Sequence, residues 1–311
     1  MIEKIIDFSV NNRFVILLLY IGIAAYGIYS MVHTPVDAIP DLSENQVIIW
    51  TEWMGRSPQI IEDQITYPLT TNLQGMPKVK AVRSQSMFGM SFIYVIFDDN
   101  TDIYWARSRV LEKLSQVQGT LPEGVKPVLG PDGTGVGHVY WYHLNSSKYD
   151  LGELRAVQDY YLKLGLQSVE GVAEVASIGG FVKQYQIDVD PNKLNAYGIG
   201  ISDVVSAVQR SNKDVGGRNI ESSDIEYFVR GKGYITSVSD IEDITLTAGK
   251  NGIPVRIKDL GAVQIGADIR RGMLDMNGEG EVVGGIIVMR YGENAQTVID
   301  RVKEKMKELE K

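Results

Sequence analysis

Two methionines in this sequence have side chains that could bind a metal, and they stand on either side of one short turn. Met87 and Met90 flank Phe88-Gly89, a pair of residues that favours a turn between two strands. A thioether sulfur is a soft ligand that suits Cu(I). Methionine is also a common filler of hydrophobic cores. The sequence therefore offers Met87 and Met90 as candidates for a metal contact, with core packing as the alternative.

The other residues that could do chemistry form no recognisable set. His138 and His143 are five positions apart on a predicted strand, so they point to opposite faces and cannot chelate one ion together. The acidic pair Asp98-Asp99 precedes a predicted helix and is better explained as a helix cap. The chain has no cysteine, which excludes disulfides, thiolate metal sites and cysteine nucleophiles. We therefore predict no catalytic residues and no cofactor.

The glycine-rich segments and the net charge argue against nucleotide binding and nucleic-acid binding. Gly130 to Gly137 and Gly278 to Gly280 lack both the Lys-Ser/Thr ending of a phosphate loop and the dinucleotide-binding spacing, so they are predicted to be turns. The net charge is -8 and no basic cluster occurs, which argues against a nucleic-acid partner. The acidity itself is ordinary for a solvated surface. A length of 311 residues allows two or three domains.

One long apolar stretch, from Phe14 to Val32, separates a short N-terminal segment from the rest of the chain. It carries no charged residue, and about 19 residues of helix at roughly 1.5 Å each cover the hydrocarbon core of a bilayer. A buried core helix would have a polar face. A cleaved signal peptide has an apolar run of only about 7 to 15 residues. The sequence predicts a retained transmembrane helix.

The residues that flank this stretch predict its orientation. Lys4 and Arg13 precede it, whereas Asp37, Asp41 and Glu44 follow it. Because cationic flanks stay in the cytoplasm, everything after about residue 34 is expected outside it, in the periplasm of a Gram-negative bacterium. The segment before the stretch, residues 1–10, has apolar residues at helical spacing and is predicted to be an amphipathic helix on the membrane surface.

The next part of the chain has a βαββαβ pattern, which predicts an α+β fold of the ferredoxin-like kind. The first helix begins at Ser57-Pro58, with Pro68 expected to kink it. Each of the two helices has one apolar stripe: Ile61, Ile65, Leu69 and Leu73 in the first; Ile103, Ala106, Val110, Leu114 and Val117 in the second. The predicted strands are 47–53, 79–86, 91–97 and 125–129, and residues 99–101 are expected to cap the second helix.

A second βαβ pattern follows and is interrupted. It comprises a strand at 139–144, a helix at 151–169 and a strand at 172–178, and it resumes with a strand at 281–289 and a helix at 294–311. The intervening residues have short strands, two short helices and a glycine-turn arm around Gly216-Gly217. We interpret them as an inserted α+β domain. Because the second unit lacks its last strand, the sequence is expected to be a fragment of a longer chain.

Short motifs along the whole chain resemble the heavy-metal efflux branch of the resistance–nodulation–division (RND) transporters. The motifs are 35–41 (PVDAIPD), 67–69 (YPL), 83–86 (RSQS), 102–107 (DIYWAR), 121–125 (LPEGV), 130–132 (GPD), 176–180 (ASIGG) and 270–272 (RRG). Within this branch, residues 105–109, 134–137 and 277–281 resemble the copper/silver pumps more than the cobalt–zinc–cadmium pumps.

The resemblance implies a proton-driven inner-membrane transporter that exports Cu(I) or Ag(I), not an enzyme. It implies a homotrimer that works with a periplasmic adaptor protein and an outer-membrane channel. The N-terminal helix and first transmembrane helix would be residues 1–34, the first porter subdomain 35–131, the second 132–180 with 272–311, and half of a docking domain 181–271. The arm at Gly216 and Gly217 would reach into a neighbouring protomer.

Two points limit what the resemblance transfers. The family's proton-relay acids and methionine metal cluster lie outside these residues. Ile269 occupies a position where copper pumps carry a methionine, with Met273 and Met276 nearby but not matched to it. A divalent-cation (Co/Zn/Cd) or amphiphile pump of the same superfamily is the first alternative. A membrane-anchored periplasmic binding or scaffold module is the second.

Overall fold

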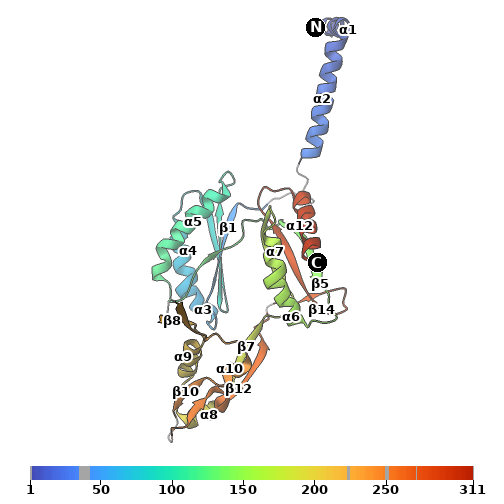
Figure 1. Ribbon diagram of the computed structural model, residues 1–311. Coiled ribbons are helices and arrows are strands. Elements are labelled where there is room, and N and C mark those ends of the chain that lie inside the picture. Colours follow the sequence, from blue (N-terminus) through green and yellow to red (C-terminus); the bar gives the residue numbers. More distant parts are fainter. Residues whose placement is uncertain (1, 35–42, 223–224, 249–251, 271, 311) are drawn as a thin grey trace. The chain divides into compact units, whose positions relative to one another are not determined.

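The computed structural model describes residues 2–34, 43–222, 225–248, 252–270 and 272–310. The predicted chain exit at 35–41 therefore lies outside the described residues. The first two elements are the helices α1 (Ile2–Asn11) and α2 (Arg13–His33) (Figure 1). Within the described residues, α2 is the one helix long and apolar enough to cross a membrane, and none of it is buried. A core helix would be buried, so this observation favours the membrane-spanning interpretation.

The next part of the chain folds as a four-stranded antiparallel sheet in the order β2-β3-β1-β4. The element order is β-α-β-β-α-β, with the two helical segments packed side by side (Figure 1). The elements are β1 (Gln46–Glu52), α3 (Pro58–Ile61), a π-helical turn η1 (Glu62–Thr66), α4 (Tyr67–Gln74), β2 (Val79–Met87), β3 (Met90–Phe97), α5 (Ile103–Val117), a short 3-10 turn η2 (Gln118–Thr120) and β4 (Val128–Leu129).

Alternating strand residues and one stripe on each helix form the core of this sheet. Val47 and Ile49 of β1 and Ile93 and Val95 of β3 are buried and alternate with more exposed residues, except at the end of β3, where Ile96 and Phe97 are buried as well. The helix residues in the same cluster are Ile61, Ile65, Leu69, Leu73, Ala106, Val110, Leu114 and Val117. These positions confirm both predicted stripes, except that Ile103 is only partly buried at the edge of the cluster.

The interruption expected at Pro68 takes the form of a π-helical turn. In this turn the backbone N–H of Tyr67 bonds to the carbonyl of Glu62, five residues back. Pro68 has no N–H and its ring crowds the preceding turn, which a widened turn accommodates. The same turn directs the buried Thr66 hydroxyl at two serines on the sheet, Ser86 at 2.7 Å and Ser91 at 2.8 Å.

Two predictions for this sheet were wrong in detail. Helix α5 is capped by Asp102, whose carboxylate accepts the Trp105 N–H at 2.7 Å, and not by residues 99–101. Asp98 instead accepts the Thr101 N–H at its carbonyl, which makes a turn before the helix. The last strand covers only 128–129 instead of 125–129, because Pro127 has no N–H to donate to the ladder.

The interrupted second pattern also forms a sheet. Strand β14 (Glu281–Met289) lies between β13 (Leu274–Asp275) and β5 (His138–Leu144), and it also pairs with β6 (Val172–Ile178). The helical segments are α6 (Leu151–Val157), a π-helical turn η3 (Gln158–Leu162), α7 (Lys163–Gln167) and α12 (Ala295–Leu309). The helix predicted over 151–169 thus ends two residues early. Asp150 caps α6 in a capping box with Glu153, and Asn294 caps α12.

The chain divides into two compact units. One comprises Met1–Tyr142, Tyr161–Ser177 and Gly285–Lys311, and the other comprises His143–Tyr160 and Ile178–Gly284. In the second unit, β7 (Lys183–Val189) pairs with β12 (Gly261–Ala267), and β10 (Thr245–Ala248) pairs with β11 (Pro254–Arg256). The helices are α8 (Pro191–Tyr197), α9 (Ile201–Ser211), α10 (Val238–Glu242) and α11 (Ile257–Leu260). Leu194, Val204, Ile241, Ile257 and Leu260 belong to their shared core.

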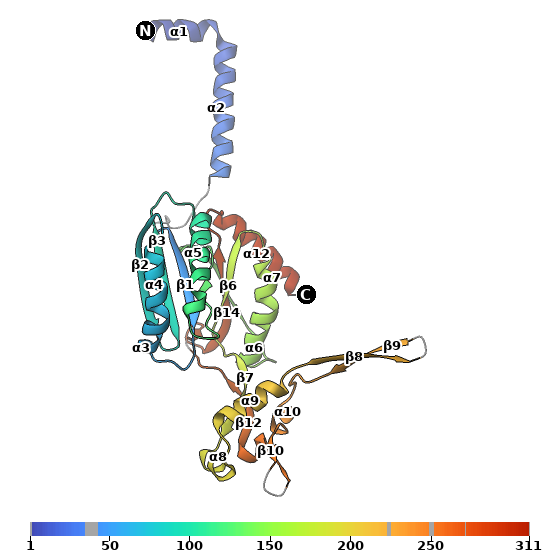
Figure 2. The same cartoon turned by 90° about the vertical axis from the view of Figure 1, so that its left-hand side faces the viewer.

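A long β-hairpin projects from this second unit (Figure 2). It is made of β8 (Val215–Ser222) and β9 (Ile225–Gly231). The prediction that Gly216-Gly217 forms the turn of an arm was wrong, because both glycines lie within β8. The register shifts between Gly216 and Asn219, so the glycines mark a β-bulge. We refer to residues 215–231 as the arm.

Candidate functional site

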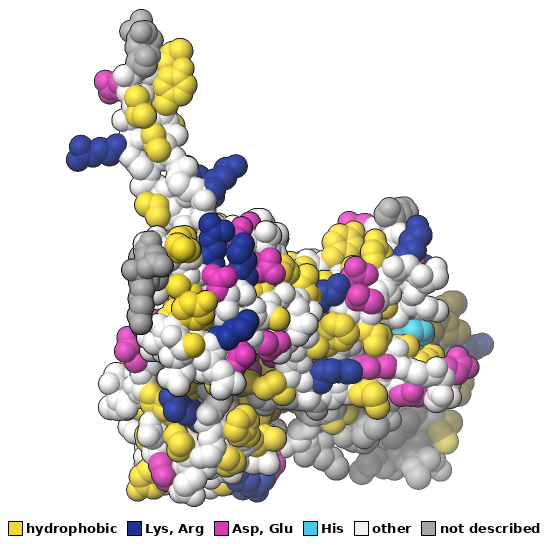
Figure 3. Space-filling view, turned by 90° about the horizontal axis from the view of Figure 1, so that it is seen from below, with side chains coloured by type: hydrophobic (Ala, Val, Ile, Leu, Met, Phe, Trp, Pro, Cys, Tyr) yellow, Lys and Arg dark blue, Asp and Glu magenta, His cyan; other side chains and the backbone are white. Residues whose placement is uncertain are grey.

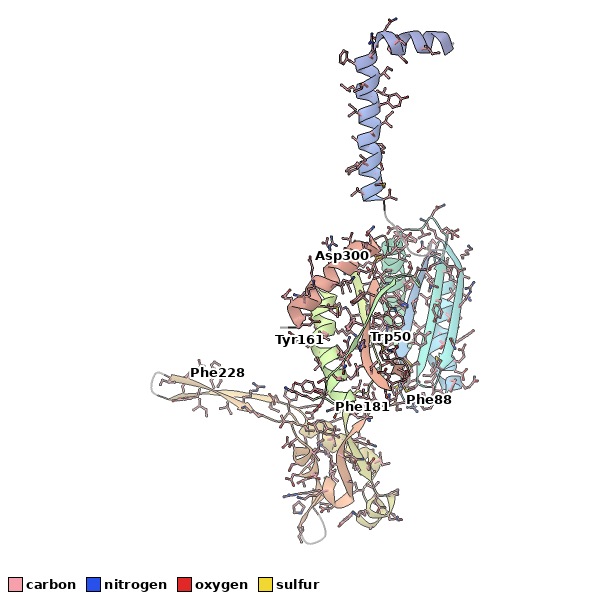
Figure 4. The ribbon with its side chains drawn as sticks, turned by 90° about the vertical axis from the view of Figure 1, so that its right-hand side faces the viewer. Trp50, Phe88, Tyr161, Phe181, Phe228 and Asp300 are labelled. Carbon is pink, nitrogen blue, oxygen red and sulfur yellow. The ribbon has the colours of Figure 1, made fainter. Side chains whose placement is uncertain are left out.

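The two predicted methionines face each other across the end of the β2–β3 hairpin. Met87 and Met90 are register partners on either side of a two-residue turn, and Gly89 has a φ of 70°, a conformation that favours glycine. Figure 4 labels Phe88 at this end of the sheet. Met87 is 42% exposed and Met90 is half-buried. We refer to this part of the molecule as the hairpin end.

The structure adds a third methionine that the sequence analysis missed. Trp53 donates its N–H to the Gly89 carbonyl at 2.9 Å, and Gly89 donates its own to the Arg56 carbonyl at 2.9 Å. These bonds hold the loop after β1 against the hairpin end and bring Met54 to Gly89. A Cβ placed on Gly89 would lie 3.3 Å from the Met54 sulfur. No local pattern signals this approach, because more than thirty residues separate the two segments.

The histidines remain apart from any metal-binding group. His138 and His143 are both exposed on β5. Within the part of the chain that the structure describes, no group of three or more His, Asp or Glu side chains could hold a metal ion.

A polar cavity of about 130 Å³ lies where several of the motif residues meet. Its lining includes Glu44, Asp99, Arg107, Asp132 and Tyr291. Arg107 donates to the Gly130 carbonyl at 2.8 Å, so the 102–107 and 130–132 motifs are joined directly.

Asp132 makes several contacts at this cavity. Its carboxylate accepts the Tyr104 hydroxyl at 3.2 Å and pairs with Arg290 at 3.6 Å, while its carbonyl accepts the Tyr291 N–H at 2.9 Å. Burial, followed by the nearby Asp132 charge, raises the pKa of Tyr104. The phenol therefore stays protonated and serves as a hydrogen-bond donor. Asp132 therefore links helix α5, through Tyr104, to the turn after β14, through Arg290 and Tyr291, which is a structural role.

A second set of motif residues converges on Glu281. Its carboxylate accepts the Gly180 N–H at 3.1 Å and pairs with Arg270. The Gly179 carbonyl accepts from Arg155 at 2.9 Å. Added side chains would clash at both glycines, since a Cβ on Gly179 would lie 2.0 Å from the Val282 carbonyl oxygen. The 176–180, 270–272 and 277–281 motifs therefore stabilise one junction of the fold.

The segment around Ile269 is open to solvent. Ile269 and Met273 are both exposed, and Met276 is slightly above one-third exposed. Met273 and Met276 flank the two residues of β13.

The arm has apolar side chains exposed along its length. Val215, Ile220, Ile225, Tyr227, Phe228 and Val229 are all exposed, and Figure 4 labels Phe228 on it. Its base is fixed by Asp214, whose carboxylate pairs with Arg230 and accepts the Gly233 N–H at 2.9 Å. The Gly233 N–H, followed by Arg230, lowers the pKa of Asp214.

Charged side chains are mixed over the face of the molecule in Figure 3. Lys and Arg are scattered singly or in pairs among Asp and Glu, without a large basic block on that face. That face therefore carries no large basic patch of the kind that binds nucleic acid. The described residues instead combine one apolar helix long enough to cross a membrane, a helix-covered sheet and an exposed arm.

Comparison with known proteins identifies the family. The AcrB/AcrD/AcrF family model matches residues 5–311. The chain belongs to this family of RND efflux transporters, and within it to the heavy-metal efflux pumps, as the motifs predicted.

Individual relatives support this placement. The chain is 51% identical to the cation efflux system protein CusA of Escherichia coli K12 and 50% identical to the putative cation efflux system protein SilA of Salmonella typhimurium, in each case over 99% of this chain and 30% of the relative. It matches an X-ray crystal structure of a heavy metal efflux pump with a TM-score of 0.86 and 32% identity, covering 98% of this chain and 30% of that one. The chain thus spans about 30% of the length of these relatives.

Proposed function

We propose that this chain forms the amino-terminal part of a proton-driven inner-membrane pump that exports Cu(I) or Ag(I). The observation that carries the choice of ion is the gradient of similarity within the family. Identity is 51% to CusA and falls to 38% with the cobalt-zinc-cadmium resistance protein CzcA of Cupriavidus metallidurans. The motifs at 105–109, 134–137 and 277–281 also resemble the copper/silver pumps more than the cobalt–zinc–cadmium pumps.

The proposed roles of the segments of this chain follow from membership of the same family. We propose that α2 is the first transmembrane helix and that residues after about 34 lie in the periplasm. Residues 35–131 form a ferredoxin-like porter subdomain, residues 132–180 and 272–311 belong to a second, and residues 181–271 form half of a docking domain. The sheet order β2-β3-β1-β4, with antiparallel neighbours throughout, supports the first of these assignments.

The partners belong to the proposal as well. The working pump is a homotrimer in the lipid bilayer, joined by a periplasmic adaptor protein and an outer-membrane channel, and it uses the proton motive force. The exposed apolar side chains of the arm support the trimer, because a hairpin this open to water needs a cover.

The test is metal tolerance in a host that lacks its own copper and silver exporters. Cells that express the coding sequence containing this chain are grown in Ag⁺, Cu²⁺, Zn²⁺ and Co²⁺, with a version whose reading frame is interrupted before Phe14 as the control. We expect the minimum inhibitory concentration of silver and copper to rise and that of zinc and cobalt to stay unchanged. Protection against zinc and cobalt alone would replace this proposal with a divalent-cation pump.

A further inference from the structure

The hairpin end gathers side chains with the chemistry of a soft-metal site. Met87 and Met90 are directly opposite each other, which places the Cβ atoms of such a pair about 4.5–5.5 Å apart on one face of the sheet. A methionine side chain has three rotatable bonds and a polarisable sulfur. The two thioethers can therefore turn toward a common point.

Met54 reaches the same point from a different segment. The two backbone hydrogen bonds between the 53–56 loop and Gly89 fix its position, and its sulfur lies over Gly89, where any larger residue would press on it. Because Gly89 immediately precedes Met90, this sulfur is adjacent to the Met87–Met90 pair. Three methionines, one from the 53–56 loop and two from the β2–β3 hairpin, thus lie at one end of the sheet.

Core packing does not explain these methionines. Met54 is 47% exposed and Met87 is 42% exposed, whereas Met76, which fills the core of the same unit, is only 5% exposed. Strand alternation leads to the same conclusion, because the core face of β3 begins at Ser91 and Met90 lies on the opposite face. Met54 and Met87 are therefore largely open to solvent, and Met90 lies on the face of the sheet away from the core.

A negative charge stands beside the cluster. Glu52 is the register partner of Met90 on β1, so the two residues share a face, and Glu52 is exposed. Its carboxylate raises the local concentration of cations. Arg56, the basic residue in the same loop, is turned to the Trp53 ring, with its guanidinium carbon 4.7 Å from the ring centroid. The exposed carboxylate of Glu52 therefore favours a cation at the hairpin end.

We propose that Met54, Met87 and Met90 form a thioether site for a soft monovalent cation of the Cu(I)/Ag(I) type. Thioether sulfur selects such ions over hard divalent cations. Metal binding is inferred only from residues at the hairpin end. That the site binds the ion during its export rests on the proposed function.

The test uses the full chain in detergent, labelled with [methyl-13C]methionine and titrated with Ag⁺. We expect the methyl signals of Met54, Met87 and Met90 to shift together and to saturate at one equivalent, while Zn²⁺ leaves them unchanged. Met87→Leu keeps an apolar side chain of similar volume and removes the sulfur. It should weaken Ag⁺ binding by roughly 10–100-fold or more, since losing even an outer partner of a metal ligand costs about that much.

Met276→Leu is the matched control, because it removes a methionine from the surface of the other unit. It should leave the affinity unchanged. If Ag⁺ shifts only other methionines, or if Met87→Leu binds as wild type does, the site is overturned and the patch is an apolar contact surface. If this result is found and the cells are still protected against silver, the proposed function is unaffected. If the protein binds Ag⁺ at this site but does not protect cells against silver, the binding site is supported and its role in export is contradicted.

Discussion

A chain of hydroxyls in the first unit shows how single residues determine the local helix geometry. Thr66 is fully buried and shares hydrogen bonds with Ser86 and Ser91, and Ser86 also donates to the Glu62 carboxylate. A buried hydroxyl without a partner is costly, so the π-helical turn that aims Thr66 at the sheet is stabilised by these bonds.

Replacing Thr66 with valine tests this account. Thr66→Val keeps the shape and leaves the two serines without their shared partner, so we expect the free energy of unfolding to fall by about 1–3 kcal/mol. Thr70→Val is the matched control, because the Thr70 hydroxyl is buried on the same helix without a hydrogen-bond partner. That change should be neutral or stabilising. Urea denaturation followed by circular dichroism measures both, and equal losses in the two variants would contradict the prediction.

The residues that could be predicted from the sequence are those whose environment is encoded locally. Leu69 and Val110 sit in apolar stripes with helical spacing, so their burial followed from the pattern alone. The helix cap did not follow, because aspartate occurs at 98, 99 and 102, and the choice of Asp102 depends on the turn that precedes the helix. The approach of Met54 to Gly89 depends on tertiary hydrogen bonds that no sequence window contains.

At the scale of elements, the arm is the feature whose geometry differs most from its prediction. The glycine pair was expected to turn the chain, but the bulge in β8 places it between paired strands. Glycine serves both purposes, because it tolerates unusual backbone angles wherever the ladder is irregular. The existence of an arm was predicted, whereas its length came only from the pairing of β8 with β9.

Asp214 makes the base of the arm sensitive to acid. Its pKa is lowered below the ordinary value of 3.8, so the contribution of the charged carboxylate is present above that pH and is lost as the pH falls through the lowered pKa. We expect the amide signal of Gly233 to stay constant from neutral pH to about 4 and to change below it. Nuclear magnetic resonance measures the midpoint. Asp214→Asn should abolish the titration, and a midpoint above 3.8 would contradict the prediction.

At the scale of the whole molecule, the charges around α2 predict which side of the membrane the rest occupies. Lys4 and Arg13 lie before or at the start of the helix, and the next basic residue after it is Arg56. We expect alkaline phosphatase fused after Ser146 to be active, because the enzyme works only outside the cytoplasm. Green fluorescent protein fused at the same point gives the complementary readout, and bright fluorescence there would reverse the topology.

The arm gives a prediction for assembly. Phe228 is 79% exposed, and an aromatic anchor at an interface costs about 2 kcal/mol or more when truncated. In the protein that contains this chain, Phe228→Ser should raise the dissociation constant of the oligomer by roughly 30-fold. Tyr197→Ser removes an exposed aromatic from α8 in the same unit and should have no effect. Mass photometry in detergent distinguishes the two variants.

The open arm also has a consequence for the life of a newly made chain. An isolated two-stranded hairpin with apolar side chains in water is marginally stable, and its edges are a template for non-native pairing. Until another surface covers it, we expect the arm to be recognised by chaperones and proteases. The lifetime of a newly made chain should therefore depend on how soon a partner surface covers the arm. At low expression such encounters are rarer, so the half-life of this chain should be shorter.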